Sequence, residues 1–188
     1  MIVETLEVCL HESDLGSERT RGDFTINDRL GIRVEPMFLS KGAKATERNA
    51  YWSTIDGVWF DLDYIEVPVL ARFHLVDSGT PGGYFLGGLG FGFATGQNVE
   101  LQQGTASETV DFEDVFSPFD LSLNLGAGFT VPVGGNRMTF DTRFALGLIN
   151  INDGGTVTFQ GAPLDVPSNN TTTLDIRFFA TYLFPLGK

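Results

Sequence analysis

The sequence is dominated by strict alternation of apolar and polar side chains, which begins near residue 30 and continues almost to residue 184. Successive side chains of a β-strand point to opposite faces, so this pattern predicts strands and leaves almost no room for helices. The alternation divides into six strand-length segments, at 31–40, 62–76, 83–97, 119–133, 138–148 and 174–184. Each segment is long enough to cross a bilayer when it is tilted.

The connections between the six segments alternate in length. Those at 77–82 and 134–136 are short and rich in Gly, whereas those at 41–61, 98–118 and 152–173 are long. This layout is typical of an up-and-down antiparallel meander, with short turns at one rim and extended loops at the other.

Alternation alone leaves two β-barrels open. In a soluble lipocalin-like barrel that binds an apolar ligand, the apolar face would point inward and the charged face would meet water. In an outer-membrane barrel the two faces are exchanged. Strand length, small side chains at mid-strand on the polar face, and aromatic residues near segment ends favour the membrane version. These aromatic residues are Phe38, Phe73, Phe85, Phe119, Tyr182 and Phe184.

The charged residues of the polar face then lie inside the barrel. They are Arg33, Arg72, Arg143 and Arg177, together with Glu35, Glu66, Asp120, Asp141 and Asp175. Charges enclosed away from bulk water must pair to offset the cost of desolvation. The sequence therefore predicts an interior network of ion pairs and hydrogen bonds.

Several segments resemble one known group of proteins. They are Leu39-Ser40-Lys41-Gly42, the strand Asp63 to Phe73, the Gly-rich stretch Tyr84 to Gly96, Gly126-Ala127-Gly128, and Arg143 to Ile151. Over about residues 30–184 the chain resembles the porin-family outer-membrane β-barrel domain of PorT type, which is similar in build to the small OmpA and OmpX barrels. The resemblance implies eight antiparallel strands, both termini in the periplasm, and insertion by the barrel-assembly machinery.

The front of the chain departs from the family pattern. Residues 1–29 contain no visible export signal and no clear strand, so we assign them to an atypical N-terminal segment ahead of a barrel domain at 30–188. We expect a truncated or wrongly started reading frame. Degenerate strands could form at 4–10 and 23–27, and any missing strands should be even in number.

The chain shows no arrangement of residues that indicates catalysis, a cofactor or a metal, so we assign no catalytic, cofactor-binding or metal-binding residue. Neither His11 nor His74 has metal-ligand spacing, and we interpret His74, near the short-turn rim, as structural. The lone Cys9 is interpreted as an incidental thiol.

Three further features have a simple interpretation. The acidic residues of the loop 98–118 could attract Ca²⁺, but a solvated acidic loop is the simpler prediction. They are Glu100, Glu108, Asp111, Glu113 and Asp114. Arg21-Gly22-Asp23 matches an integrin-binding tripeptide by chance, and Asn169 and Asn170 stand in sequons that matter only in a secreted eukaryotic chain.

The net charge of -12, from 12 basic and 24 acidic residues, disfavours nucleic acid as a partner. We therefore predict a small, non-enzymatic bacterial outer-membrane β-barrel protein, with a filled interior, no large open pore, and a structural or surface-interaction role. Its expected surroundings are outer-membrane lipid, and its surface partner is left open. The alternative is the soluble lipocalin-like barrel.

Overall fold

The computed structural model describes residues 2–14, 22–45, 57–77, 80–103, 105–134 and 136–184, and along the first strand it describes the backbone alone. The regular elements of these residues are all strands. They are β1 (Ile2–Asp14), β2 (Gly22–Thr25), β3 (Leu30–Val34), β4 (Met37–Ala45), β5 (Gly57–His74), β6 (Gly82–Gln103), β7 (Ala106–Asp111), β8 (Phe119–Val133), β9 (Asn136–Gly147), β10 (Gly155–Phe159), β11 (Ala162–Val166) and β12 (Thr172–Phe184).

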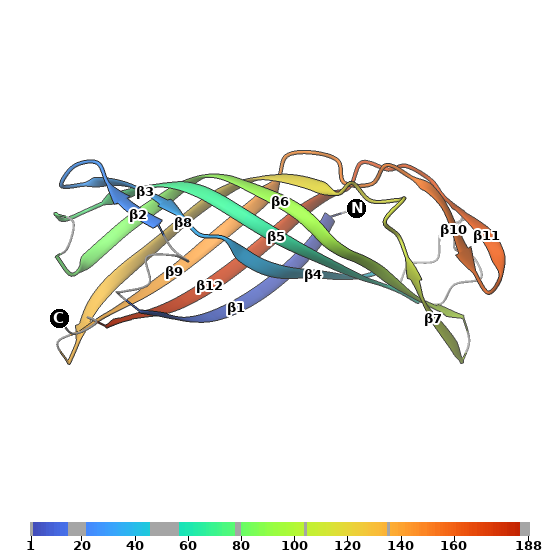
Figure 1. The fold of residues 1–188 in the computed structure, drawn as a ribbon, viewed down its shortest axis with the longest axis horizontal. Helices are drawn as coiled ribbons and strands as arrows, with labels where there is room; N and C mark the ends of the chain where they lie inside the picture. The colour runs from blue at the N-terminus through green and yellow to red at the C-terminus, as the bar shows by residue number, and fades with distance from the viewer. Residues whose placement is uncertain are drawn as a thin grey trace.

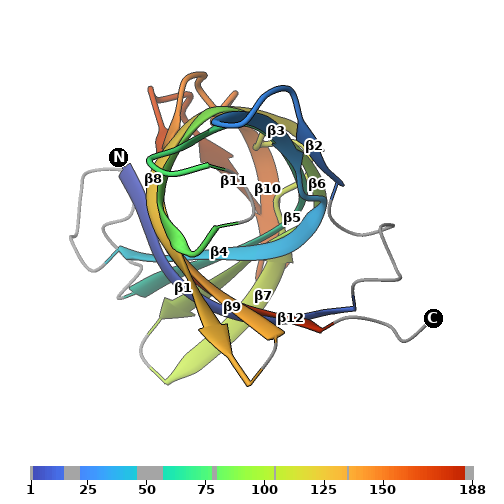
Figure 2. The same cartoon turned by 90° about the vertical axis from the view of Figure 1, so that its left-hand side faces the viewer.

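Ten of these strands form one sheet that curls around a common axis (Figures 1 and 2). The order is β1-β12-β9-β8-β6-β5-β3-β2, with β4 also on β5 and β7 also on β6, while β10 and β11 form a separate hairpin. The six predicted segments are all present, and neighbours from β3 to β12 pair antiparallel. The prediction of an all-β, up-and-down antiparallel architecture is confirmed.

The segment predicted at 31–40 is divided into β3 and β4, which pair with successive stretches of β5. The break falls at Glu35 and Pro36. Proline has no backbone N–H to donate to a ladder, so a strand is readily interrupted there.

The N-terminal segment contributes two strands, at the places where degenerate strands were predicted. β2 pairs antiparallel with β3, but β1 pairs parallel with β12. The resemblance implies both termini in the periplasm, which would place both ends of the chain at the same rim of the barrel. For the described residues this expectation is wrong. Ile2 lies beside Thr172 at the long-loop rim, whereas Phe184 lies at the opposite end, because β1 and β12 run in the same direction.

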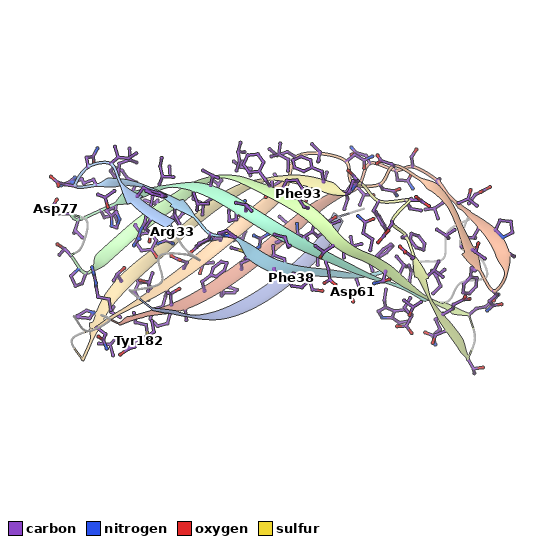
Figure 3. All side chains as sticks on the ribbon, viewed as in Figure 1. Arg33, Phe38, Asp61, Asp77, Phe93 and Tyr182 are labelled. Carbon is purple, nitrogen blue, oxygen red and sulfur yellow. The ribbon has the colours of Figure 1, made fainter. Side chains whose placement is uncertain are left out.

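Side-chain burial shows which face of the barrel is apolar. Along β5, Ile65, Val69 and Phe73 are exposed on the outside, while the intervening Glu66 and Leu70 are buried within. Figure 3 shows Phe93 on the outer surface of the sheet. This is the arrangement of a membrane barrel, and it excludes the lipocalin-like alternative, in which the charged face would point outward.

The outer apolar face has the height of a bilayer core. It extends from Ile65 on β5 to Leu75, just beyond the end of that strand, a rise of about 33 Å along the chain, or about 25 Å along the barrel axis at a 40° tilt. Phe38, Ile65, Phe93 and Phe119 are in register across four strands at its upper edge.

Aromatic residues also mark the lower edge of this belt. Phe73 pairs with Phe85, and Tyr182 accepts a hydrogen bond of 2.5 Å from the Asn136 side chain beside the turn that joins β8 to β9. Aromatic rings at both edges match the predicted girdles. The side chain of Phe184 lies outside the described part of the chain.

Two neighbouring glycines of β6 provide a test of how tightly the wall is packed. A Cβ atom on Gly88 would collide with the Val69 carbonyl and lie 2.9 Å from the Leu70 Cα atom, whereas one on Gly87 would meet only the Leu125 side chain at 3.5 Å. We expect Gly88→Ala to lower the free energy of unfolding by about 1–3 kcal/mol, because strand backbone must shift. Gly87→Ala should change it by less than about 0.5 kcal/mol. Urea titration in lipid vesicles measures both, and equal effects would contradict this packing.

Candidate functional site

The inward-facing charged residues meet in the centre of the barrel. They come from strands around the wall and, for Glu35, from the break between β3 and β4. Figure 3 shows Arg33 toward the end of the barrel that carries Asp77. Five are cationic and six are carboxylates: Arg33, Lys41, Arg72, Arg143 and Arg177, with Asp23, Glu35, Glu66, Asp120, Asp141 and Asp175. The predicted interior network is confirmed, and all nine residues assigned to it take part.

One half of the network, the central cluster, consists of Lys41, Glu66, Asp120, Asp175 and Arg177. Arg177 donates from Nη1 and Nη2 to the two carboxylate oxygens of Glu66, at 2.7 and 2.9 Å, and from Nη2 to Asp175 at 2.6 Å. The Lys41 ammonium lies 3.0 Å from Asp120 and 3.3 Å from Asp175. Paired, charge-assisted bonds of this kind fix the distance between opposite walls of the barrel.

The other half, the rim cluster, lies nearer the short turns. Asp141 accepts hydrogen bonds from Arg33 at 3.0 Å and Arg143 at 3.2 Å, and also from the Tyr84 hydroxyl. Arg143 pairs in addition with Glu35 at 2.6 Å. These contacts join β3, β6 and β9, which are not neighbours in the sheet, so the charges brace the barrel across its interior.

At the edge of the rim cluster the pairs reach the protein surface. Asp23 accepts a hydrogen bond from Arg33 at 2.9 Å and lies 3.6 Å from Arg72. The Arg72 guanidinium in turn stacks on the Tyr84 ring, 3.8 Å from its centroid, in a cation–π contact.

Sequence reasoning missed three members of this network. Lys41 was assigned to a loop, although the alternation that places Phe38 outside and Leu39 inside also places Lys41 inside. Asp23 was noted in the tripeptide Arg21-Gly22-Asp23, but its carboxylate belongs to the rim cluster, while Arg21 lies outside the described residues. Tyr84 was named only as the first residue of the Gly-rich stretch and was given no role, although its hydroxyl bonds to Asp141.

Beyond the membrane belt the wall continues toward the long-loop rim. There the apolar side chains face inward and the polar ones face outward, the reverse of the arrangement within the belt. Asp63 pairs with Gly96 and Tyr64 with Ala94, which leaves Thr95 unpaired in a β-bulge. The bulge turns the odd-numbered Val99 and Leu101 inward, whereas the odd-numbered positions below it face lipid. Apolar side chains now lie inside and polar ones outside, as water on the outer surface requires.

These upper residues enclose a second, apolar core, which we call the cap. Its buried members are Val58, Leu62, Tyr64, Val99, Leu101, Val110, Phe112, Val115, Phe116, Ile151, Val157, Phe159 and Val166. They belong to the ends of β5 and β6, to β7, to the segment 112–117, to the connection between β9 and β10, which holds Ile151, and to the β10–β11 hairpin. The prediction that 98–118 and 152–173 are plain loops is therefore wrong, because burial of these side chains orders them into strands.

The acidic residues of 98–118 lie on the outside of the cap. Glu100, Glu108, Asp111, Glu113 and Asp114 are all exposed, as predicted for a solvated acidic surface. Glu108 also accepts a hydrogen bond of 2.8 Å from the backbone N–H of Gln160, which ties β7 to the hairpin.

The remaining candidate residues are dispersed. His74 lies at the short-turn end of β5, with its ring 5.7 Å from that of Tyr84, so it is far from the cap. Asn169 and Asn170 are exposed in the connection that precedes β12. The side chains of Cys9 and His11 lie outside the described part of the chain.

The class of protein follows from this arrangement: antiparallel strands that are apolar outside and charged inside form an outer-membrane type of β-barrel. The family model described as "Outer membrane protein beta-barrel domain" matches residues 20–153. The chain belongs to this family, and its place is the outer membrane. No curated protein and no solved structure matches the chain. Within the described ranges, no helix is long and apolar enough to span a membrane.

Proposed function

We propose that this small outer-membrane barrel is a non-enzymatic, non-conducting protein that presents a folded cap at the cell surface. The observation that carries the proposal is the closed centre of the barrel. Lys41 and Arg177 reach carboxylates on facing strands, and each side chain is only 1% exposed. A lumen crossed by such pairs leaves little room for a solute to pass.

The cap provides the surface for contact with a partner. In this family short turns face the periplasm and long connections face outward, so the cap lies outside the cell. It is ordered by its own apolar core and carries exposed carboxylates. Lipid covers the belt below it, and the barrel-assembly machinery inserts the chain.

Reconstitution in planar bilayers tests the absence of a pore. We expect the purified protein to leave the bilayer conductance at its background level, whereas a large porin in the same bilayer gives clear steps. Heat-modifiable gel mobility verifies that the protein is folded. Reproducible conductance steps from the folded protein would refute the closed lumen.

A further inference from the structure

Burial within the charged network changes along the barrel axis. The rim cluster touches solvent near the short turns, where the side chains of Asp23, Glu35 and Arg72 are 43%, 14% and 13% exposed. In the central cluster, nearer the cap, each of the charged side chains is at most 2% exposed. Water therefore reaches the network from one end of the barrel.

The segment 112–117, which we call the plug turn, is held at the opposite end. Its Phe112, Val115 and Phe116 are buried in the cap core, and the ring of Phe116 lies 5.8 Å from that of Phe60 on β5. Its two carboxylates, Glu113 and Asp114, are exposed. One face of the turn is therefore apolar and directed into the cap, while the other meets water.

Backbone hydrogen bonds hold the plug turn between β6 and the segment that follows β9, which flank β8 in the sheet. Phe112 donates its N–H to the Gln97 carbonyl of β6 at 2.8 Å. Ser117 donates to the Ile151 carbonyl at 2.8 Å, and the Val115 carbonyl accepts from Asp153 at 2.9 Å. The plug turn therefore continues the wall just ahead of β8, and its buried Phe112, Val115 and Phe116 side chains belong to the cap core.

We infer that the plug turn makes the lumen one-sided, closed to solutes from outside the cell and open to water only at the periplasmic rim. The barrel then has two seals in series, an apolar one in the cap and an ionic one in the central cluster. The apolar seal keeps the ionic one dry, which strengthens its ion pairs because the local dielectric is low. This inference rests on the proposed non-conducting function and adds which end of the lumen is closed.

Cysteine labelling tests the position of the outer seal. Ser122 is 2% exposed, and its hydroxyl accepts a hydrogen bond of 2.9 Å from Asn124 beside the central cluster, so Ser122→Cys is a nearly isosteric reporter. In a Cys9→Ser background, intact cells are treated with a membrane-impermeant maleimide. We expect no labelling of S122C while the plug turn is intact. The double substitution Phe112→Ser/Phe116→Ser should raise its labelling rate about tenfold or more, since the apolar seal is lost.

Two controls separate the seal from general unfolding. Glu113→Gln/Asp114→Asn changes the exposed side of the same turn and should leave S122C unlabelled. His74→Cys, at the other end of the lumen, should react only after the outer membrane is permeabilised. Heat-modifiable mobility shows whether each variant is folded.

Three results would overturn the inference. They are labelling of S122C from outside with the native plug turn, unchanged labelling in the folded F112S/F116S variant, and labelling of H74C in intact cells. Conductance is recorded on the same proteins. Conductance in the native protein would refute the proposed function, whereas a silent native protein with outside-labelled S122C would refute only the one-sided seal.

Discussion

Replacing Arg177 with alanine is expected to lower the free energy of unfolding by about 3–5 kcal/mol. Its guanidinium holds both oxygens of Glu66 and one of Asp175, and all three side chains are buried. Without it, Glu66 and Asp175 keep an ion pair with Lys41, whose ammonium lies 3.9 Å from Glu66 and 3.3 Å from Asp175, but they lose their charge-assisted hydrogen bonds. Urea unfolding in lipid vesicles, followed by tryptophan fluorescence, measures the change.

A surface arginine and a double variant complete this experiment. Arg29 pairs with Asp77 at 3.9 Å with both side chains largely exposed, so Arg29→Ala should cost less than about 1 kcal/mol. Arg177→Met combined with Glu66→Gln should cost less than R177A alone, because charges are removed from both sides of the pair. If R177A is no worse than R29A, the central cluster does not brace the barrel.

Placing an arginine on the lipid face at mid-strand should be almost as damaging. Leu125 is 54% exposed on the outside of β8, half-way between its two ends, so Leu125→Arg brings a charge to the middle of the hydrocarbon layer. We expect the free energy of unfolding to fall by about 2–4 kcal/mol. Unfolding in vesicles reports it directly.

The matched control is Val133→Arg, on the same face of the same strand but at its short-turn end. There the cost should fall to about 0–1 kcal/mol, since the charge reaches the interface. A cost independent of position on β8 would show that the outer face does not lie in lipid, and the membrane placement would have to be abandoned.

The sequence predicted the wall of the barrel well and its outer end poorly. From β5 to β12 the alternation located the described strands that cross the membrane, because each of their side chains contacts either lipid or the lumen. A shift of a strand by one position would move its apolar side chains into the lumen and its polar ones into lipid. The same rule failed on β6 beyond the bulge at Thr95, where odd-numbered side chains change from the outer to the inner face while the apolar residues keep their odd numbers. Val99 and Leu101 could not be placed inside without knowledge of that bulge.

For the candidate site, the type of interaction was predictable and the partners were not. Arg143 and Asp141 share a strand and a face, so their proximity follows from the sequence. The contact of Arg177 with Glu66 joins residues 111 positions apart on non-adjacent strands, and it depends on how the barrel curves. Lys41 was missed because the predicted strand was ended at residue 40, although β4 continues to Ala45, and Asp23 was missed because the alternation is weak around it.

By itself the sequence determined the six main strands and which side chains of each share an apolar or a charged face, because both depend on a two-residue period that neighbouring residues already express. Burial in the structure then showed that the apolar face is the outer one. The tertiary structure alone decided that β1 lies parallel to β12, which ions pair, and that the outer connections fold into a cap with a plug turn. Those features arise from contacts across the barrel, between residues far apart in the chain, and no local pattern records them.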